Sequence, residues 1–416
     1  MRYNLLTNWI QYQISKILNH KGGFAMNPIT ITLILLVFTI VMFVSEKISL
    51  ALTSMIVCVA LVLTKVLNMK TAFEGFINSN VILFVAMFIV GGAFFETGMA
   101  NRVGGVVTKF AKTERQLIVA IMIIVGLMSG VLSNTGTAAV LIPVVIGIAS
   151  KSGFSKSKLL MPLVFAAAMG GNLSLIGAPG NLIGQSALQE IGLKFGFFEY
   201  AKIGLPILIC GIIYFSLIGY KFLPEANSKD RNENFEEKDY SNIPSWKQNL
   251  SLMIMVLTIL AMIFESKIKI PLAISGCIGA IILVLTGVIS EKEAYKTIDM
   301  QTIFLFGGTL ALAKALDKTG AGEKIASTVV GTLGENASPF ALLVAIFLLS
   351  CVMTNFMSNT ATTALLVPIS CLLHKVWELI QELLLWQLLL EDLVLTQHQL
   401  ECPLIQWLCL LEDINL

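Results

Sequence analysis

Residues 133–137 read Ser-Asn-Thr-Gly-Thr, and residues 358–362 read Ser-Asn-Thr-Ala-Thr. Each stretch interrupts an apolar segment, 116–150 in the first case and 338–375 in the second. The apolar arms are about 14–16 residues long, which as helices reach only about 21–24 Å. A bilayer core is roughly 30 Å thick. We therefore expect two re-entrant helical hairpins whose polar tips stop near the middle of a membrane.

The composition agrees with a membrane location. Of the 416 residues, 56% are hydrophobic and 13% are charged, and the mean hydropathy is +0.83, whereas about a quarter of a soluble domain is charged. The net charge of +2 is too balanced to indicate nucleic acid as a partner. The seven cysteines include no CxxC pair, so neither a disulfide framework nor a zinc site is expected. We predict an all-α polytopic protein of the cell (inner) membrane.

The chain is internally duplicated. Residues 48–73 match residues 270–295 at 11 of 26 positions without gaps, an offset of 222. Residues 128–143 match residues 353–368 at 8 of 16 positions, an offset of 225. Self-similarity of this kind at a nearly fixed offset indicates two copies of one structural unit.

The number of crossings predicts how the copies are related. Crossings are expected at 29–45, 48–66, 80–98, 160–188 and 203–223 in the first copy, and at 249–264, 270–288 and 301–316 in the second. Five crossings in the first copy place the start of the second on the opposite side of the membrane, an inverted-topology repeat. Basic loops at 99–116 and 151–158 indicate the cytoplasmic side.

The predicted organisation has five parts. Residues 26–223 form the first transmembrane repeat, and 249–375 form the second, inverted and incomplete. Between them, 224–248 is a polar, charged cytoplasmic linker. Residues 1–25 carry basic and no acidic residues, which disfavours export of the N-terminus. We interpret them as a non-native extension ahead of a start at Met26, and 376–416 as an aberrant tail.

A hairpin tip offers two kinds of ligand. Carbonyl groups are exposed at the end of the first arm and suit a small cation, and amides at the start of the next arm suit an anion. Ser129 and Thr354 each lie four residues before their tip, which places a hydroxyl one helical turn below it. An ordinary helix cap is the alternative reading of either motif alone.

A second polar break lies within the expected span 160–188. Residues 170–181 read Gly-Gly-Asn-Leu-Ser-Leu-Ile-Gly-Ala-Pro-Gly-Asn. Glycines and a proline in mid-span interrupt the hydrogen-bond ladder, which lipid tolerates only where the freed groups line a cavity or bind something. We expect a discontinuous transmembrane helix beside a hairpin tip, the alternative being a packed kink.

No charged residue lies at the centre of an expected span. Proton-coupled carriers commonly use buried carboxylates, so their absence favours coupling to a metal cation held by neutral oxygens. The three histidines form no cluster, and no buried nucleophile with a base is visible. An enzyme is therefore not expected.

The paired Ser-Asn-Thr tips and the Gly-Gly…Leu-Ile-Gly-x-Pro-x-Asn break resemble the divalent anion:sodium symporter family of dicarboxylate, citrate and sulfate carriers, over roughly residues 29–375. The resemblance extends to the wider ion transporter superfamily. It implies Na+-coupled symport of a small divalent anion, a di- or tricarboxylate or sulfate. It also implies an elevator mechanism and a homodimer.

The resemblance also implies site residues. For Na+ it implies Ser129, Ser133, Asn134 and Gly177 in one site and Thr354, Ser358 and Asn359 in its symmetry mate. For the substrate it implies Asn134, Thr135, Ser174, Pro179, Asn359 and Thr360.

The chain departs from the pattern after about residue 379. The second copy should have its own break near 397–404, but 397–405 read Gln-His-Gln-Leu-Glu-Cys-Pro-Leu-Ile. Plausible codons for 397–406, read in a shifted frame, give Thr-Pro-Ile-Gly-Met-Pro-Ala-Asn-Thr. We infer a frameshift near 372–379. A proton-linked antiporter or oxyanion permease of the same superfamily, and an inactive frameshifted fragment, are the alternatives to the sodium-coupled carrier.

Overall fold

A computed structural model describes residues 27–106, 113–152, 154–190, 192–223, 240, 243–333, 339–354 and 357–377. Within these ranges all regular structure is helical and no strand occurs, which confirms the predicted all-α fold. The predicted extension 1–25, the tail beyond 377 and the second break expected at 397–404 lie outside the described residues.

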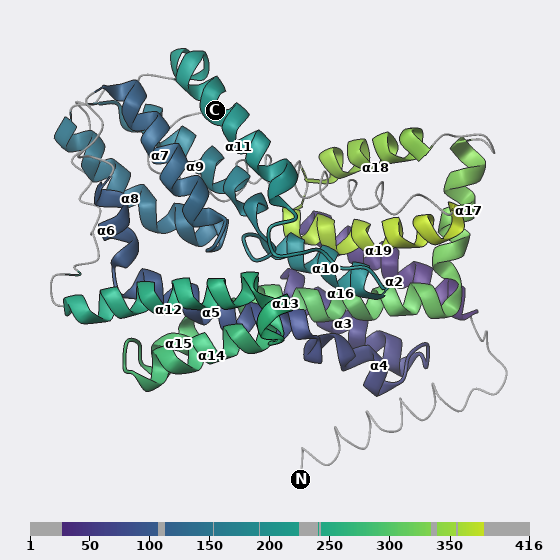
Figure 1. Cartoon of the computed structure of the whole chain (residues 1–416). Coiled ribbons are helices and arrows are strands. Elements are labelled where there is room, and N and C mark those ends of the chain that lie inside the picture. The colour runs from purple at the N-terminus through teal and green to yellow at the C-terminus, as the bar shows by residue number, and fades with distance from the viewer. Residues whose placement is uncertain are drawn as a thin grey trace, which may run out of the picture.

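The elements run along the chain as follows (Figure 1), with α for α-helices and η for 3-10 helices: α2 (Pro28–Ser45), α3 (Leu50–Leu63), α4 (Met69–Phe73), η1 (Glu74–Ile77), α5 (Ser79–Glu96), α6 (Met99–Val106), α7 (Glu114–Ser129), α8 (Asn134–Ser152), α9 (Lys156–Gly170), η3 (Gly171–Leu173), α10 (Pro179–Glu190), α11 (Ala201–Leu217), η4 (Gly219–Lys221), α12 (Ser245–Ile263), α13 (Glu265–Ile268), α14 (Leu272–Leu285), α15 (Glu291–Thr297), α16 (Met300–Thr319), α17 (Ala321–Leu333), α18 (Pro339–Thr354) and α19 (Asn359–Trp377).

The helices recur at the offsets found in the sequence. Helices α3 and α14 begin and end 222 residues apart, and α6 and α17 begin 222 residues apart. The hairpin arms α7 and α8 correspond to α18 and α19 at an offset of 225, at both ends of each arm. This recurrence supports the duplication, whereas the inverted relation of the copies stays a prediction.

Three of the described helical segments are long and apolar enough to cross a membrane. They are Pro28–Ser45, the segment Met69–Glu96, which comprises α4, η1 and α5, and Ser245–Ile263. The crossings expected at 48–66 and 270–288 are instead helices of 14 residues each. Each ends early because the chain turns into the left-handed region, at Lys65 (φ 59°) and at Gly287 (φ 70°).

Helix α12 begins at Ser245, inside the segment predicted as a linker. Of that linker, residues 224–239 lie outside the described ranges.

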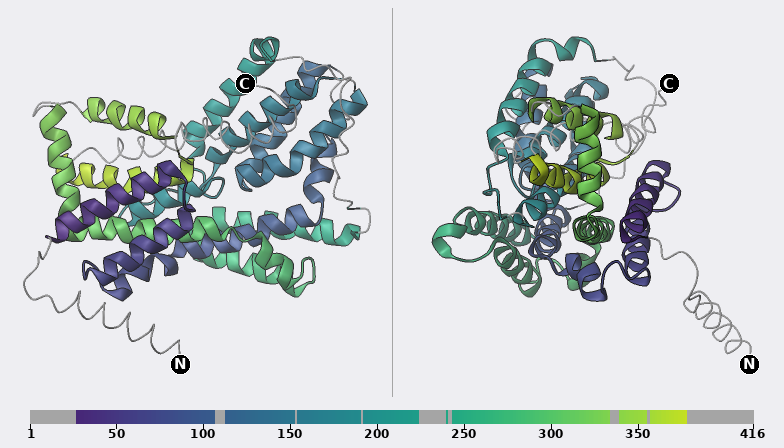
Figure 2. Two further views of the ribbon diagram at one scale, coloured as in Figure 1. Left: turned by 180° about the vertical axis from the view of Figure 1, so that it is seen from behind. Right: turned by 90° about the vertical axis from the view of Figure 1, so that its right-hand side faces the viewer.

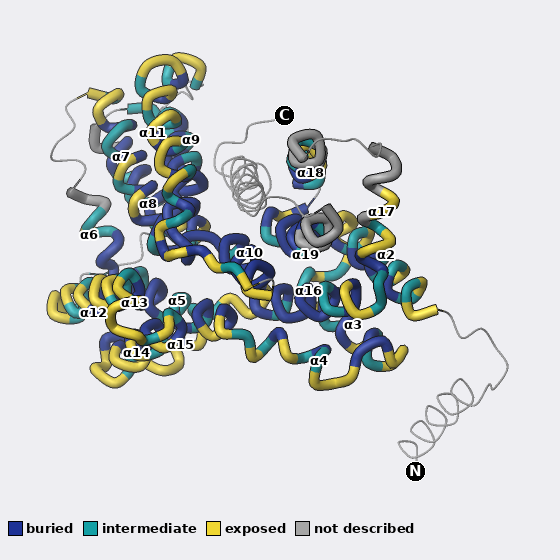
Figure 3. The backbone as a smooth tube through the Cα atoms, turned by 45° about the vertical axis from the view of Figure 1, so that its right-hand side comes forward, coloured by how far each residue is buried: buried dark blue, intermediate teal, exposed yellow. Residues whose placement is uncertain are grey.

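Helices α12 and α14 show long exposed stretches in Figure 3. The exposed large side chains there are apolar, among them Met253, Leu257 and Leu260 on α12 and Ile278 and Leu285 on α14. Exposed apolar surface on this scale suits contact with lipid.

The span expected at 160–188 is discontinuous, as predicted. Helix α9 ends at Gly170, a short 3-10 turn follows, and α10 begins at Pro179. Proline is favoured at the first position of a helix because its missing N–H costs no hydrogen bond there. Residues 174–178 have no helical structure between the two halves.

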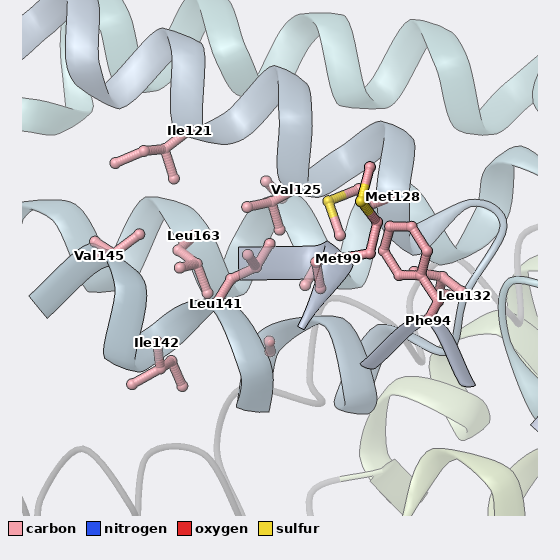
Figure 4. Close-up of a cluster of buried hydrophobic side chains, with 14 of the residues drawn as sticks. Phe94, Met99, Ile121, Val125, Met128, Leu132, Leu141, Ile142, Val145 and Leu163 are labelled. Carbon is pink, nitrogen blue, oxygen red and sulfur yellow. The ribbon is translucent and has the colours of Figure 1, made fainter. Parts of the chain in front are cut away.

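The two hairpins stand on a common layer. Figure 1 shows α5, α12, α14 and α16 forming a lower layer, with α7–α9 above one part of it and α18–α19 above another, and Figure 2 shows the same division from behind. The first hairpin and α9 share one apolar core. Ile121 and Val125 of α7, Leu141 and Val145 of α8, and Leu163 of α9 all lie in it (Figure 4).

Two glycines allow α7 and α9 to touch. A Cβ atom at Gly170 would lie 2.3 Å from the carbonyl oxygen of Gly126. Such backbone contact is the use that membrane helices make of small residues. Because the hairpin arm therefore lies directly on the broken helix, the position of the tip is fixed relative to the break.

Substituting Gly170→Ala should separate these backbones. We expect the free energy of unfolding to fall by about 1–3 kcal/mol, as for other overpacked sites, which thermal denaturation in detergent would measure. Gly171→Ala is the matched control, since its Cβ would have no neighbour closer than 3.4 Å. Equal melting temperatures for the two variants would contradict the close packing.

Candidate anion and cation site

The first hairpin turn is closed by the serine of its motif. Ser133 Oγ accepts a hydrogen bond from the backbone N–H of Gly136 at 3.1 Å, and the Ser133 carbonyl accepts from Thr137 N at 2.9 Å. This is helix capping, which satisfies amides that the first turn of α8 leaves without partners. Asn134 begins α8 with its side chain only 3% exposed.

The second hairpin turn repeats this geometry. Ser358 Oγ accepts from Ala361 N at 3.3 Å, and the Ser358 carbonyl accepts from Thr362 N at 2.9 Å. Asn359 begins α19 and is 7% exposed. Both Ser-Asn-Thr turns thus adopt the same cap, so Ser133 and Ser358 each act as the cap of the helix that follows.

The broken helix is held together by Asn181. Its Nδ2 donates to the carbonyl oxygens of Gly171 at 3.0 Å and Ser174 at 2.7 Å. The side chain is fully buried, and no hydrogen-bond partner for its Oδ1 occurs in the described structure. A Cβ at Gly177 would lie 2.3 Å from the carbonyl oxygen of Gly171, so only glycine fits where the chain folds back on itself.

Hydroxyl groups fasten the first hairpin to the break. Ser129 Oγ, at the end of α7, donates to the carbonyl oxygen of Ala167 in α9 at 2.5 Å. Ser174 Oγ donates to the carbonyl oxygen of Gly130 at 2.5 Å and accepts from Ile176 N at 3.2 Å. The Ala167 carbonyl also accepts from the Gly171 N–H at the end of its own helix, so the Ser129 hydroxyl adds a second donor there. The Gly130 carbonyl follows the last residue of α7 and receives its donor from the break.

The tip asparagine reaches the break as well. A Cβ at Gly171 would lie 3.5 Å from Asn134 Nδ2. Since Asn181 Nδ2 binds the Gly171 carbonyl, the two amide side chains flank one residue. The structure therefore brings together Ser129, Asn134 and the Gly177 region, expected to bind Na+, and Ser174, expected to bind the substrate.

The second hairpin meets the other half of the broken helix. Helix α19 packs against α10, and Ala364 and Val367 share an apolar cluster with Leu182, Ile183 and Ala187 of α10. The break thus has the first hairpin packed on the segment before it and the second hairpin packed on the segment after it.

The remaining predicted residues differ in exposure. Thr354 is buried, and its Oγ1 donates to the carbonyl oxygen of Cys351 at 3.0 Å. Thr135 and Ser358 are exposed, and Thr360 and Pro179 are half-buried. Exposed polar groups beside buried ones suit a site that opens to water on one side.

Buried polar atoms without partners gather on these elements. Among the described residues they include Thr137 Oγ1 in α8, Asn181 Oδ1 in α10, and Asn359 Nδ2 and Thr363 Oγ1 in α19. Each such atom is costly unless a ligand or water satisfies it. Asn181 was quoted in the sequence motif but not assigned to the site, although its place at the end of a Pro-x-Asn break was the available signal.

The site has no charged side chain among the residues named for it. No group of three or more His, Cys, Asp or Glu side chains able to hold a metal occurs in the part of the chain that the structure describes. Any ion bound here would be held by neutral oxygens and helix ends.

Comparison with known proteins identifies a family for the chain. A family model described as citrate transporter matches residues 40–389. The chain belongs to this citrate transporter family. Members of the family are transporters and not enzymes, and with its apolar helices the chain is a multi-pass membrane protein.

Three bacterial transporters are similar in sequence to this member of the citrate transporter family. An uncharacterized transporter of Haemophilus influenzae is 29% identical over 81% of this chain and 75% of its own length. The uncharacterized transporter YfbS of Escherichia coli is 33% identical over 47% of this chain, a region that spans 33% of that protein. The sodium-dependent dicarboxylate transporter SdcS of Staphylococcus saprophyticus is 24% identical over 78% of this chain and 69% of its own length.

The fold is similar to a solved one. The crystal structure of the YdaH transporter of Alcanivorax borkumensis matches with a TM-score of 0.59 and 14% identity, over 81% of this chain and 78% of that chain. At this identity the likeness concerns the fold alone.

Replacing Ser174 with alanine should loosen the first hairpin tip. The change removes two buried hydrogen bonds and leaves the Gly130 carbonyl without this donor. We expect a loss of about 1–3 kcal/mol, seen as faster amide hydrogen exchange in the turn after α7. Ser216→Ala is the control, because the half-buried Ser216 hydroxyl donates within its own helix, to the Ile213 carbonyl. Unchanged exchange at the turn in Ser174→Ala would refute the role of this hydroxyl.

Proposed function

We propose that this chain is a secondary active transporter that couples the symport of a small divalent anion, a di- or tricarboxylate or sulfate, to Na+. The observation that carries the proposal is the packing of two identically capped, neutral hairpin turns on the two halves of one broken helix. Membership of the citrate transporter family supports the substrate class. Similarity to the sodium-dependent dicarboxylate transporter SdcS supports the coupling ion.

Oxygen atoms near the first tip suit Na+. The proposed ligands of the first Na+ site are the side chains of Ser129, Ser133 and Asn134 and the backbone at Gly177. Those of the corresponding site in the second copy are Thr354, Ser358 and Asn359. The Ser129 hydroxyl donates its proton to the Ala167 carbonyl, so the lone pairs of its oxygen can bind a cation. The carbonyl ends of α7 and α9, which approach each other at Gly126 and Gly170, add negative partial charge.

Amide groups and helix N-termini suit the anion. Helices α8, α10 and α19 all begin at the tips or the break, at Asn134, Pro179 and Asn359, where helix dipoles favour negative charge. The proposed substrate contacts come from Asn134, Thr135, Ser174, Pro179, Asn359 and Thr360. Asn359 Nδ2, buried and without a partner in the described structure, is a donor ready for a carboxylate.

Charge neutralisation explains why the two solutes would move together. A divalent anion bound by neutral groups carries its full charge, and charge within a membrane is expensive. One Na+ in each of the two proposed cation sites cancels the two negative charges, so the fully loaded site can cross an apolar interface that a half-loaded site cannot. In the elevator mechanism that we propose, the hairpins and the broken helix move as one block, within a homodimer.

Substrate uptake driven by sodium tests this function. In proteoliposomes with an inward Na+ gradient we expect uptake of labelled succinate, citrate or sulfate. Asn134→Ala and Asn359→Ala should each lower it at least tenfold, because a hydrogen bond to a charged group is worth about 1.5–3 kcal/mol. Asn249→Ala, at an exposed asparagine that accepts from Arg102, should leave it unchanged.

Other outcomes separate the alternatives. Uptake that follows a proton gradient and ignores sodium would replace the proposal with the proton-linked antiporter. Uptake by a frame-corrected chain but not by this one would identify this chain as an inactive fragment. Asparagine variants with wild-type uptake would remove the hairpin tips from the site.

A further inference from the structure

A polar contact joins α5 to the second half of the broken helix. Asn80, in the first turn of α5, donates from Nδ2 to Ser186 Oγ at 2.5 Å and to Gln189 Oε1 at 3.0 Å. Asn80 and Ser186 are 4% and 1% exposed. Asn80 lies more than 100 positions before both of its acceptors in the chain. None of the three residues belongs to the site described above.

The contact crosses a boundary between two packing groups. Helix α5 packs mainly with α12, α14 and α15, in the lower layer of Figure 1. Helix α10 packs mainly with α19 and continues from the break. Around the contact the boundary is apolar, with Val81 and Phe84 of α5 in one cluster with Leu182 and Ala187 of α10.

In the contact between Asn80, Ser186 and Gln189, every donated proton has an acceptor. Ser186 Oγ gives its own proton to the Leu182 carbonyl at 3.1 Å, so it can only accept from Asn80. The Asn80 amide uses both protons, one on Ser186 and one on Gln189. Gln189 is itself exposed, so the buried part of the contact is the bond from Asn80 to Ser186. If α10 moved away from α5, the buried Asn80 amide would lose both acceptors, and this is costly.

The position equivalent to Asn80 in the second copy makes a different contact. Thr302 stands 222 positions after Asn80, and its hydroxyl donates to Asp299, the residue that caps its own helix α16. Position 80 thus carries a side chain and a contact that the equivalent position 302 does not repeat, while the counterpart of α10 in the second copy lies outside the described residues.

We propose that Asn80 is a latch that holds α10 against α5 in the conformation seen here, and that it must release before the block carrying the broken helix can move. This inference rests on the proposed elevator motion, because only a moving α10 needs a latch. Helix α10 is also fixed on another side, where Gln185 Oε1 accepts from Phe195 N at 2.8 Å and its Nε2 donates to Phe195 O at 3.3 Å. That bond lies within one packing group and would travel with the block.

Thiol labelling of the full-length chain in detergent tests the latch without a transport assay. A cysteine is placed at Ala187, which is 7% exposed beside the contact, and its reaction with N-ethylmaleimide is followed by peptide mass spectrometry. Asn80→Leu, which keeps the size but removes the donor, should raise the labelling rate about fivefold to tenfold. Ser186→Ala with Gln189→Leu should raise it equally, and combining all three changes should add nothing more.

Native Cys58 serves as the internal control, since it is fully buried in α3, away from the boundary. A latch predicts faster labelling at position 187 with an unchanged rate at Cys58. Parallel acceleration at both cysteines would show that Asn80 is only a folding contact, and no acceleration at position 187 would show that α10 is not held by it. Either result overturns the latch, while the sodium-driven uptake assay decides the proposed function separately.

Discussion

Every backbone N–H and C=O group within a bilayer needs a partner inside the protein, and this requirement shapes the broken helix and both hairpins. Where the chain leaves the helical path, a nearby side chain supplies the missing partner. Asn181 binds two carbonyls of the break, Ser174 binds the carbonyl at the first turn, and Ser133 and Ser358 cap the helices that follow the turns. The polar residues of the motifs are thus first of all what makes an interrupted helix possible in lipid.

Glycine residues bring the backbones of the candidate site close together. Gly126 and Gly170 bring α7 and α9 into backbone contact, and Gly171 and Gly177 fold the break onto itself. Because no side chain stands between these backbones, the hydroxyls of Ser129 and Ser174 can reach carbonyls on the neighbouring element. The resulting cluster contains many oxygen atoms and no charge, which is the setting that an alkali cation and an anion bound together would need.

The sequence was informative where local chemistry decides the structure and uninformative where packing decides it. The tips, the break and the recurring helix bounds followed from polar interruptions and from the offsets of 222 and 225. The 14-residue length of α3 and α14 did not, because a left-handed turn at Lys65 or Gly287 leaves no mark on hydropathy. The bond from Asn80 to Ser186 was also beyond reach, since it joins distant segments that only the fold brings together.

The two hairpins differ in how completely their polar groups are satisfied, and this bears on which solute each would hold. In the first, Ser129 bonds to α9 and the break supplies a donor to the turn, and Thr137 Oγ1 is the buried atom of α8 without a partner among the described residues. In the second, Thr354 bonds within its own helix, and Asn359 Nδ2 and Thr363 Oγ1 are buried without partners among the described residues. Since an unpaired buried donor gains the most from a new acceptor, the second hairpin has more to gain from a bound carboxylate than the first. Under the proposed function, an anion between the hairpins would be drawn most strongly to Asn359, while the first tip, which has fewer unpartnered polar atoms among the described residues, would keep its shape for the cation.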